Sequence, residues 1–281
     1  MKNALTVDLE DWYHVCGVGE YSDPSRWDEY ESRVSRSTEK ILAILAGSGA
    51  RGTFFVLGYI ARKNPALVKA VSEAGHEVAT HGYYHRRVFD MTPSEFKDDV
   101  AESLGVIESI TGKKVAGYRA PEWSMRPDTF WALETLRRLG VHYDSSMVPL
   151  TRMGDRSFGK SPYRIDTRCG PIYEFPLTTF RCLWENLPYT GGLPMRIAPY
   201  WFILEGIKRL NRQGKPGMIY VHPWEFDRER PRLDLPLSKR FMHYFNTGST
   251  EPKLRGLLKH LKFTSISEVL GIGSQAKAAR D

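Results

Sequence analysis

The sequence predicts an α/β fold with a parallel sheet, and three observations support this prediction. Short apolar runs, rich in β-branched and aromatic residues, alternate with longer amphipathic segments along the chain. The amphipathic segments are about 10 to 18 residues long, the usual length of a helical crossover between parallel strands. No linker, internal repeat or low-complexity run interrupts the alternation. We therefore expect one layered α/β unit.

The apolar runs mark the expected strands in chain order. We assign strands to Ala4–Val7, Thr53–Leu57, His76–Thr80 and Met218–Val221, with a last short apolar segment at Ile266–Leu270. The second of these runs consists of β-branched, aromatic and aliphatic residues only, which is typical of a strand buried on both faces.

Segments with helical periodicity separate these strands. We assign helices to Ser35–Leu45, Asn64–Ala74, Pro93–Ile110 and Asp128–Leu139. Pro65 stands in the first turn of the second helix and Gly75 at its C-terminal end, which are favoured positions for these residue types. Each helix presents an apolar stripe that we expect to cover the sheet.

Length and composition fit one large domain. A chain of 281 residues can bury a full hydrophobic core without disulfide bonds. We expect this domain to cover residues 1–274. Residues 147–193, where short β-like pieces alternate with Pro and Gly, are expected to form an elaborated loop region, and residues 275–281 a flexible tail.

Net charge and cysteine content bear on the binding partners of the protein and on its cellular compartment. The formal net charge is +7, which a solvated basic surface explains, with attraction to anionic lipid headgroups or an acidic glycan as the alternative. The basic residues are scattered, so we expect no nucleic-acid partner. Three cysteines without CxxC spacing, and an N-terminal apolar run too short for a signal peptide, lead us to expect a cytoplasmic protein.

Polar clusters follow the expected strands, where parallel α/β folds place their functional residues. The first cluster, Asp8-Leu9-Glu10-Asp11-Trp12, holds three carboxylates within four residues. A cation or a shared proton would relieve their mutual repulsion. A solvated acidic turn explains this cluster equally when it is taken alone.

The second cluster, His81-Gly82-Tyr83-Tyr84-His85, places two histidines four residues apart. Such a pair can face one point across a helical turn, which is a usual spacing of metal ligands, although structural histidines also occur at this spacing. Together, the first two clusters supply two imidazoles and a carboxylate. This is the ligand set, with open positions, of a hydrolytic metal site.

Three further clusters each hold one chemically notable side chain. Arg119, close to Pro121, can orient a carboxylate, and a surface salt bridge is the alternative. Asp144 precedes Ser145 and Ser146, a sequence that is also compatible with a simple turn or a helix cap. His222 follows the strand Met218–Val221 and is a candidate general acid or a structural histidine.

These five clusters, in this order, resemble the polysaccharide deacetylase family, carbohydrate esterase family four. The segment from Gly75 to His85 resembles the second motif of the family, Arg119 with Pro121 the third, Asp144 the fourth and His222 the fifth. The resemblance runs from about residue 4 to residue 270.

Details of the first and last motifs are similar to one subfamily. The first cluster, the sequence His222-Pro223-Trp224-Glu225 and the late segment 246–252 resemble a subfamily associated with bacterial exopolysaccharide-assembly loci. The resemblance implies a distorted (β/α) barrel related to the TIM barrel, with seven strands. It also implies a metal-dependent enzyme that hydrolyses acetamide groups of sugars.

The resemblance assigns roles to individual side chains. His81 and His85 are implied as metal ligands, Asp8 as a catalytic base that Arg119 holds ionised, and His222 as the acid that protonates the leaving amine. The fourth motif would orient this acid, so the resemblance implies that the carboxylate of Asp144 contacts the ring of His222.

The first motif departs from the family pattern. The family has two adjacent aspartates, the first a base and the second a metal ligand, and Asp8 aligns with the first. The ligand role falls to Glu10 or Asp11. Strand alternation places Glu10 on the same side as Asp8, whereas a turn that starts at Leu9 favours Asp11. We favour Asp11 and keep Glu10 as the alternative.

The implied reaction removes N-acetyl groups from N-acetylhexosamine units of a polysaccharide or lipid-linked oligosaccharide and releases acetate. Zn²⁺ is the expected metal, and two nitrogens with one oxygen also suit Co²⁺, Ni²⁺ or Fe²⁺. A backbone N–H near Trp12 is expected to bind the oxyanion. We expect the sugar to contact Trp12, Tyr84, Pro121, Trp123 and Trp224.

The implied reaction bears on the partners of the protein, and other functions are also compatible with the sequence. A lipid-linked substrate would bring the protein to a membrane surface, and the sequence leaves the oligomeric state open. Two other functions stay open. One is a hydrolase of the same fold that acts on a small amide or cyclic ureide, and the other is a catalytically inactive carbohydrate-binding protein.

Overall fold

The structure is a computed structural model that describes residues 1–151 and 153–272. The predicted end of the domain at residue 274 and the predicted tail at residues 275–281 therefore lie outside the described residues.

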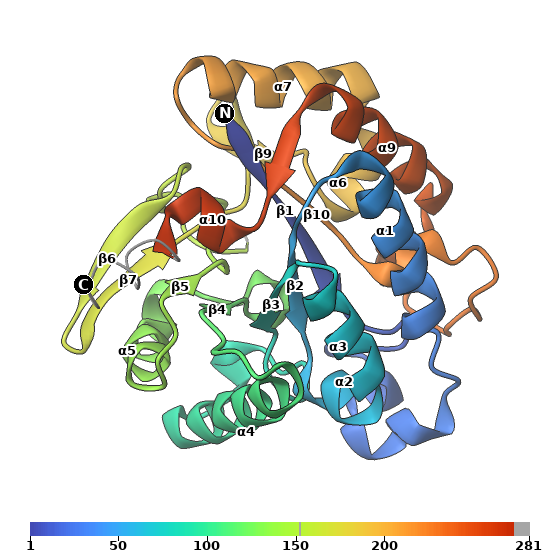
Figure 1. The fold of residues 1–281 in the computed structure, drawn as a ribbon, viewed down its shortest axis with the longest axis vertical. Helices are drawn as coiled ribbons and strands as arrows, with labels where there is room; N and C mark the ends of the chain where they lie inside the picture. Colours follow the sequence, from blue (N-terminus) through green and yellow to red (C-terminus); the bar gives the residue numbers. More distant parts are fainter. Residues whose placement is uncertain (152, 273–281) are drawn as a thin grey trace.

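In the main sheet of the described residues, eight strands run parallel and seven of these form a continuous row, which confirms the predicted α/β class (Figure 1). In spatial order they are β10 (Met218–Val221), β1 (Lys2–Leu9), β2 (Thr53–Val56), β3 (Glu77–Thr80), β4 (Gly117–Tyr118), β5 (Tyr143–Asp144) and β7 (Gly170–Glu174). β6 (Tyr163–Thr167) pairs antiparallel with β7, and β11 (Lys262–Thr264) pairs with the first residues of β1. The helices lie outside these strands, as in a distorted barrel.

The register of the central strands brings their carboxyl ends to one edge. Leu9 of β1 pairs with Val56 of β2, and Val56 pairs with Thr80 of β3. On the other side of β1, Val7 pairs with Val221 of β10. The residues that follow β1, β3 and β10 consequently lie close together, although β1 and β10 end more than 200 positions apart in the chain.

The principal helices are α1 (Val34–Ser48), α2 (Gly58–Lys63), α3 (Pro65–Glu73), α4 (Pro93–Thr111), α5 (Trp131–Arg138), α7 (Tyr200–Arg212) and α9 (Thr250–His260). The other α-helices of the described residues are α6 (Gly192–Ile197), α8 (Leu237–Tyr244) and α10 (Ile266–Leu270). A capping box starts α4, because Thr92 Oγ1 accepts from Glu95 N and the Glu95 carboxylate accepts from Thr92 N. Gly112, with φ of 65°, ends it.

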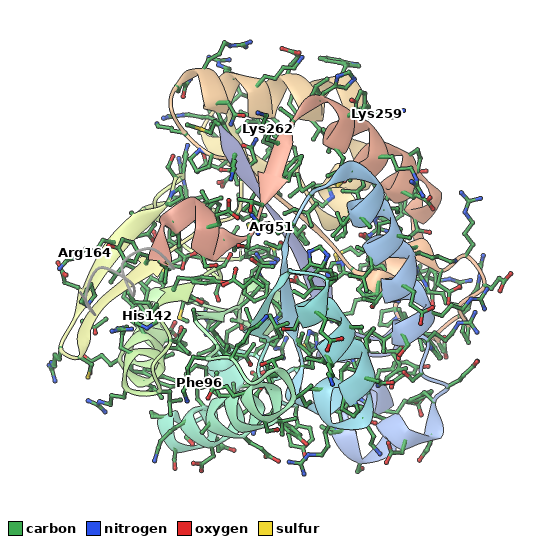
Figure 2. The ribbon with its side chains drawn as sticks, viewed as in Figure 1. Arg51, Phe96, His142, Arg164, Lys259 and Lys262 are labelled. Carbon is green, nitrogen blue, oxygen red and sulfur yellow. The ribbon has the colours of Figure 1, made fainter. Side chains whose placement is uncertain are left out.

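Side chains of the helices fill the space between helices and sheet (Figure 2). Phe96 of α4 is fully buried and packs edge-on against Tyr118 of β4, with ring centroids 5.6 Å apart. Arg164 and Lys259 lie at the outer surface (Figure 2). Among the described residues, no helix combines the length and apolar character that a membrane span requires.

Three predicted elements differ in detail from the structure. The helix expected at Asp128–Leu139 starts at Trp131, because a 3₁₀ turn at Pro127–Thr129 precedes it. The segment Ile266–Leu270 is a short helix capped by Ser265. Residues 147–193 contain the β6–β7 hairpin and a second hairpin of β8 (Thr179–Cys182) and β9 (Glu185–Pro188). Because β7 pairs with β5 in the main sheet, part of the expected loop region belongs to the core sheet.

Candidate active site

Polar side chains from three strands of the same sheet meet at its carboxyl edge. Asp8 and Glu10 come from the end of β1, His81 follows β3 and His222 follows β10. Strand alternation points Asp8 and Glu10 to the same side of the sheet. The predicted convergence of the first, second and fifth clusters is therefore confirmed.

Glu10, His81 and His85 form a compact group of possible metal ligands. Glu10 Oε1 lies 3.6 Å from the Nε2 atoms of both His81 and His85. Burial alone would raise the pKa of the Glu10 carboxyl, but the nearby imidazoles of His85 and His81 hold this pKa well below its ordinary value. Glu10 is thus an anion that faces two ring nitrogens, a donor set that fits a divalent ion.

The second cluster is a tight turn, whereas the sequence suggested one turn of helix. Gly82 has φ of +77° and His85 has φ of +52°. A side chain at Gly82 would also approach Asp99 Oδ2 to 2.9 Å. Asp99, on α4, accepts hydrogen bonds from the backbone N–H groups of Tyr83 (2.7 Å) and Tyr84 (3.2 Å). These bonds fix the turn that presents both histidines.

Asp11 does not join the ligand group, and this corrects our preference for Asp11 over Glu10. Its two carboxylate oxygens accept hydrogen bonds from Ser32 Oγ (2.6 Å) and from the backbone N–H groups of Arg33 and Val34, at the start of α1. The backbone N–H of Trp12 also donates to Asp11, over 3.0 Å. Asp11 therefore anchors a helix N-terminus. The N–H of Trp12 itself is engaged in this bond, and the predicted oxyanion donor near Trp12 stays a prediction.

Asp8 forms a buried ion pair with Arg119, as predicted. Arg119 Nη1 lies 2.6 Å from Asp8 Oδ1, and the Arg119 side chain is fully buried. The guanidinium also donates to Thr6 Oγ1 (2.9 Å) and to the carbonyl of Ser145 (3.0 Å). These contacts leave Asp8 Oδ2 facing His222, with a separation of 3.9 Å from Nε2. The pair keeps one carboxylate oxygen directed into the site.

His222 faces a carboxylate on each side of its ring. Its Nε2 lies 3.7 Å from Glu10 Oε1, and its Nδ1 lies 3.8 Å from Glu225 Oε2. The ring stacks on Trp224 with centroids 4.7 Å apart. Burial alone would lower the pKa of His222, but the neighbouring carboxylates of Glu225 and Glu10 raise it above the ordinary value. Glu225 in turn lies 3.2 Å from Arg196 Nε, so it stays ionised.

Asp144 does not orient His222, which corrects the role that the resemblance implied. Asp144 is fully buried, accepts a hydrogen bond from Ser146 and lies beside the Glu174 carboxyl group. Burial raises the pKa of Asp144 to about 6 and that of Glu174 well above its ordinary value. Burial and the proximity of Asp144 therefore favour the protonated form of Glu174. Glu225 takes the place beside His222 that was expected for Asp144.

The predicted sugar-binding residues differ in accessibility. Trp12 is 5% exposed and donates its indole N–H to the carbonyl of Glu31, so it belongs to the core. Trp123 packs on the guanidinium of Arg119, and Trp224 on His222. Pro121 is also buried. The aromatic ring of Tyr84 is 37% exposed and is the one among these five side chains that offers a free face.

Sequence reasoning missed four residues that shape the site. Glu225 was visible in the fifth cluster, but its contact with His222 depends on the 3₁₀ turn Pro223–Phe226. Glu174 lies on β7, within the region that the sequence predicts as an elaborated loop. His14 and Cys16 follow the first cluster on a loop that packs against His85, and no spacing rule marks them.

Fold and site together place a group of possible metal ligands beside Asp8 and His222 at the carboxyl edge of a distorted α/β barrel. Comparison with known proteins finds two family matches. Residues 26–143 match the polysaccharide deacetylase family, and residues 145–271 match a family described as a domain of unknown function, DUF3473. The chain thus carries a polysaccharide deacetylase domain. The match contains His81, His85 and Arg119, whereas the assignment of Asp8 and His222 rests on geometry.

Related proteins agree with this assignment. The chain is 34% identical over 153 residues to a peptidoglycan deacetylase-like protein, FGM2, of Gibberella zeae, and the alignment covers 52% of the chain and 44% of that protein. A putative polysaccharide deacetylase of Mycobacterium smegmatis shares the fold, with a TM-score of 0.63, 21% identity and coverage of 98% and 92%. The allantoinase Puue also shares it, with a TM-score of 0.62, 16% identity and coverage of 95% and 87%. The chain therefore spans less than half of the curated relative, and the fold occurs in proteins named for different reactions.

Proposed function

We propose that the protein is a metal-dependent N-deacetylase that hydrolyses acetamide groups of N-acetylhexosamine units in a glycan and releases acetate. One observation carries this proposal. The ligand group of Glu10, His81 and His85 lies next to two further ionisable groups, Asp8 and His222, within one buried site. A carbohydrate-binding protein has no need for this combination of a ligand group, a base and an acid.

The ligand group suits Zn²⁺, and Co²⁺, Ni²⁺ or Fe²⁺ would also accept two nitrogens and one oxygen. Glu10, His81 and His85 would hold the ion. When bound, a divalent ion of this kind polarises a carbonyl group and lowers the pKa of a coordinated water.

Two side chains would move protons. We propose that Asp8 Oδ2 takes the proton of the attacking water, because Arg119 binds the other oxygen and Oδ2 faces the site. His222 would then give a proton to the departing amine through Nε2, while Glu225 faces its Nδ1. Each proton transfer of this kind contributes roughly 100- to 10,000-fold in rate.

The substrate class follows from the relatives and from the surface beside the site. The related Gibberella zeae protein is named for a peptidoglycan deacetylase. We propose a polysaccharide or lipid-linked oligosaccharide as substrate, in a bacterial exopolysaccharide-assembly system. α8 exposes Leu237 and Phe241 on its outer face, and its inner His243 packs on Trp224 at 4.4 Å. This apolar stripe would contact a lipid carrier or a membrane surface.

The proposed setting is the cytoplasmic side of a membrane. All three cysteines are free thiols in the structure, which is compatible with a reducing compartment. Cell fractionation tests this setting, and sedimentation with vesicles that contain anionic lipid tests membrane association. Recovery of the protein outside the cytoplasm and the membrane-associated fraction would contradict the proposal.

The deciding experiment measures acetate release. Purified full-length protein with Zn²⁺ should release acetate from N-acetylated chito-oligosaccharides, and the double variant His81→Ala, His85→Ala should lose at least ~100-fold in kcat/KM. His142→Ala is the matched control, because this histidine is exposed and lies outside the ligand group. Tight glycan binding without acetate would instead identify a binding protein. Turnover of allantoin alone would identify a ureide hydrolase.

A further inference from the structure

The two histidines of the ligand group differ in what holds their outer ring nitrogens. Nδ1 of His81 lies 2.8 Å from the backbone carbonyl oxygen of Arg119. A carbonyl is a common partner for the second nitrogen of a metal-binding histidine. Nδ1 of His85 lies 3.3 Å from the thiol sulfur of Cys16, which also lies 3.1 Å from the backbone carbonyl of His85. A sulfur atom thus takes the place of the usual oxygen.

Cys16 is held firmly in this place. It is 5% exposed, and Lys239 of α8 donates a hydrogen bond to its backbone carbonyl. His14, two residues earlier on the same loop, is also buried, and its ring centroid lies 6.2 Å from that of His85. The backbone N–H of Asp11 donates to Nδ1 of His14 over 3.0 Å, which ties the loop to the end of β1. The loop therefore packs against the outer side of the His85 ring.

We infer that Cys16 is a positioning residue for His85 and that it sets the metal affinity of the site. The inference deepens the proposed function and rests on its ligand group. A histidine that binds metal through Nε2 carries its remaining proton on Nδ1, and this proton needs an acceptor. The sulfur of Cys16 is the side-chain acceptor at Nδ1 of His85. It fixes both the tautomer and the rotation of the ring, so that Nε2 points at Glu10.

The alternative to this role is a simple packing residue. A packing role depends on the size of the side chain, whereas the positioning role depends on an acceptor atom at the end of it. Serine keeps an acceptor at a similar place, and alanine removes it. The comparison of Cys16→Ser with Cys16→Ala therefore separates the two roles. Cys182→Ser is the matched control, because Cys182 is exposed on β8.

The test measures Zn²⁺ affinity of the full-length apoprotein by competition with a chromogenic chelator. Loss of an outer-sphere partner of a metal ligand typically weakens metal binding about 10- to 100-fold, and we expect this loss for Cys16→Ala. Cys16→Ser should retain most of the affinity, and Cys182→Ser all of it. The absorption spectrum of the Co²⁺-loaded protein should change in Cys16→Ala and stay unchanged in Cys182→Ser.

His85→Ala serves as the reference in the same assay, and thermal unfolding confirms that each variant is folded. If Cys16→Ala binds Zn²⁺ as tightly as Cys182→Ser while His85→Ala loses affinity, the role of Cys16 is refuted and the proposed metal site stands. If Cys16→Ala and Cys16→Ser lose equal Zn²⁺ affinity, an acceptor atom at position 16 is not what matters. This result also refutes the proposed role of Cys16. If His85→Ala binds Zn²⁺ normally, the ligand group itself is wrong.

Discussion

Replacement of Asp11 by alanine tests which carboxylate belongs to the metal-ligand group, because the sequence left Asp11 and Glu10 as alternatives. Asp11 is 2% exposed and accepts hydrogen bonds from Ser32 Oγ and from three backbone N–H groups, two of them at the start of α1. Truncation leaves these donors without their acceptor and removes a negative charge from the N-terminal end of the helix. The variant should therefore lose stability and keep its metal.

The size of the loss follows from these contacts. Loss of a helix-capping side chain costs about 0.5–2 kcal/mol, and a buried hydrogen bond to a charged group contributes about 1.5–3 kcal/mol. The bonds share one carboxylate and do not add, so we expect a loss of about 2–4 kcal/mol in the free energy of unfolding. For a chain of this size, this corresponds to a decrease of roughly 4–15 °C in Tm.

Calorimetry and Zn²⁺ titration of the same samples test this prediction. Asp11→Ala should melt at a lower temperature than the wild type and bind Zn²⁺ with unchanged affinity. Glu10→Gln should show the opposite pattern, with a small change in Tm and a large loss of affinity. An Asp11→Ala protein that melts normally, or that loses Zn²⁺ as Glu10→Gln does, would refute the assignment.

Three other predictions concern the acid, the buried carboxyl pair and the metal. Glu225→Gln should lower kcat about 100-fold with little change in KM, because His222 loses the anion that faces its Nδ1; steady-state kinetics that match the wild type would exclude this role. Burial raises the pKa of Asp144 to about 6 and that of Glu174 well above its ordinary value, so this pair binds more protons in the folded protein than in the unfolded chain above about pH 4. The stability that Asp144 contributes should therefore fall, by up to about 3 kcal/mol, as pH rises from about 4 to 6. Urea unfolding of Glu174→Gln at several pH values should differ from the wild type in its pH slope, and equal slopes in both proteins would contradict the raised pKa values of this pair. Dialysis against a chelator should abolish acetate release and added Zn²⁺ should restore it, whereas full activity after dialysis would argue against a metal.

The part of the fold that the sequence predicted is the part that local patterns encode. β1, β2, β3 and β10 are apolar runs bounded by polar residues, and α4 carries its own capping box. β7 lies among the short β-like pieces of the expected loop region, and it starts with Gly170 and Pro171, which are unfavourable in strands. Its place in the sheet depends on pairing with β5, which is a contact between distant segments.

The candidate site likewise has a part that sequence patterns predict and a part that depends on details of the folded chain. The pairing of Asp8 with Arg119 and the meeting of Glu10 with the two histidines follow from strand ends that lie together in a parallel sheet. The choice between Glu10 and Asp11 depends on where the strand ends and the turn begins, since one residue reverses the direction of a side chain. β1 continues to Leu9, so Glu10 keeps the direction of Asp8. Glu225 lies beside His222 in the place expected for Asp144. This placement depends on contacts in the folded chain, and the spacing of the motifs along the sequence does not reveal it.

The most direct measurement of the central claim is a crystal structure of the zinc-loaded protein with anomalous data at the zinc edge. We predict one zinc ion at about 2.0–2.2 Å from Nε2 of His81, Nε2 of His85 and a carboxylate oxygen of Glu10. A zinc ion bound to Asp11, or one that leaves either histidine uncoordinated, would contradict the account.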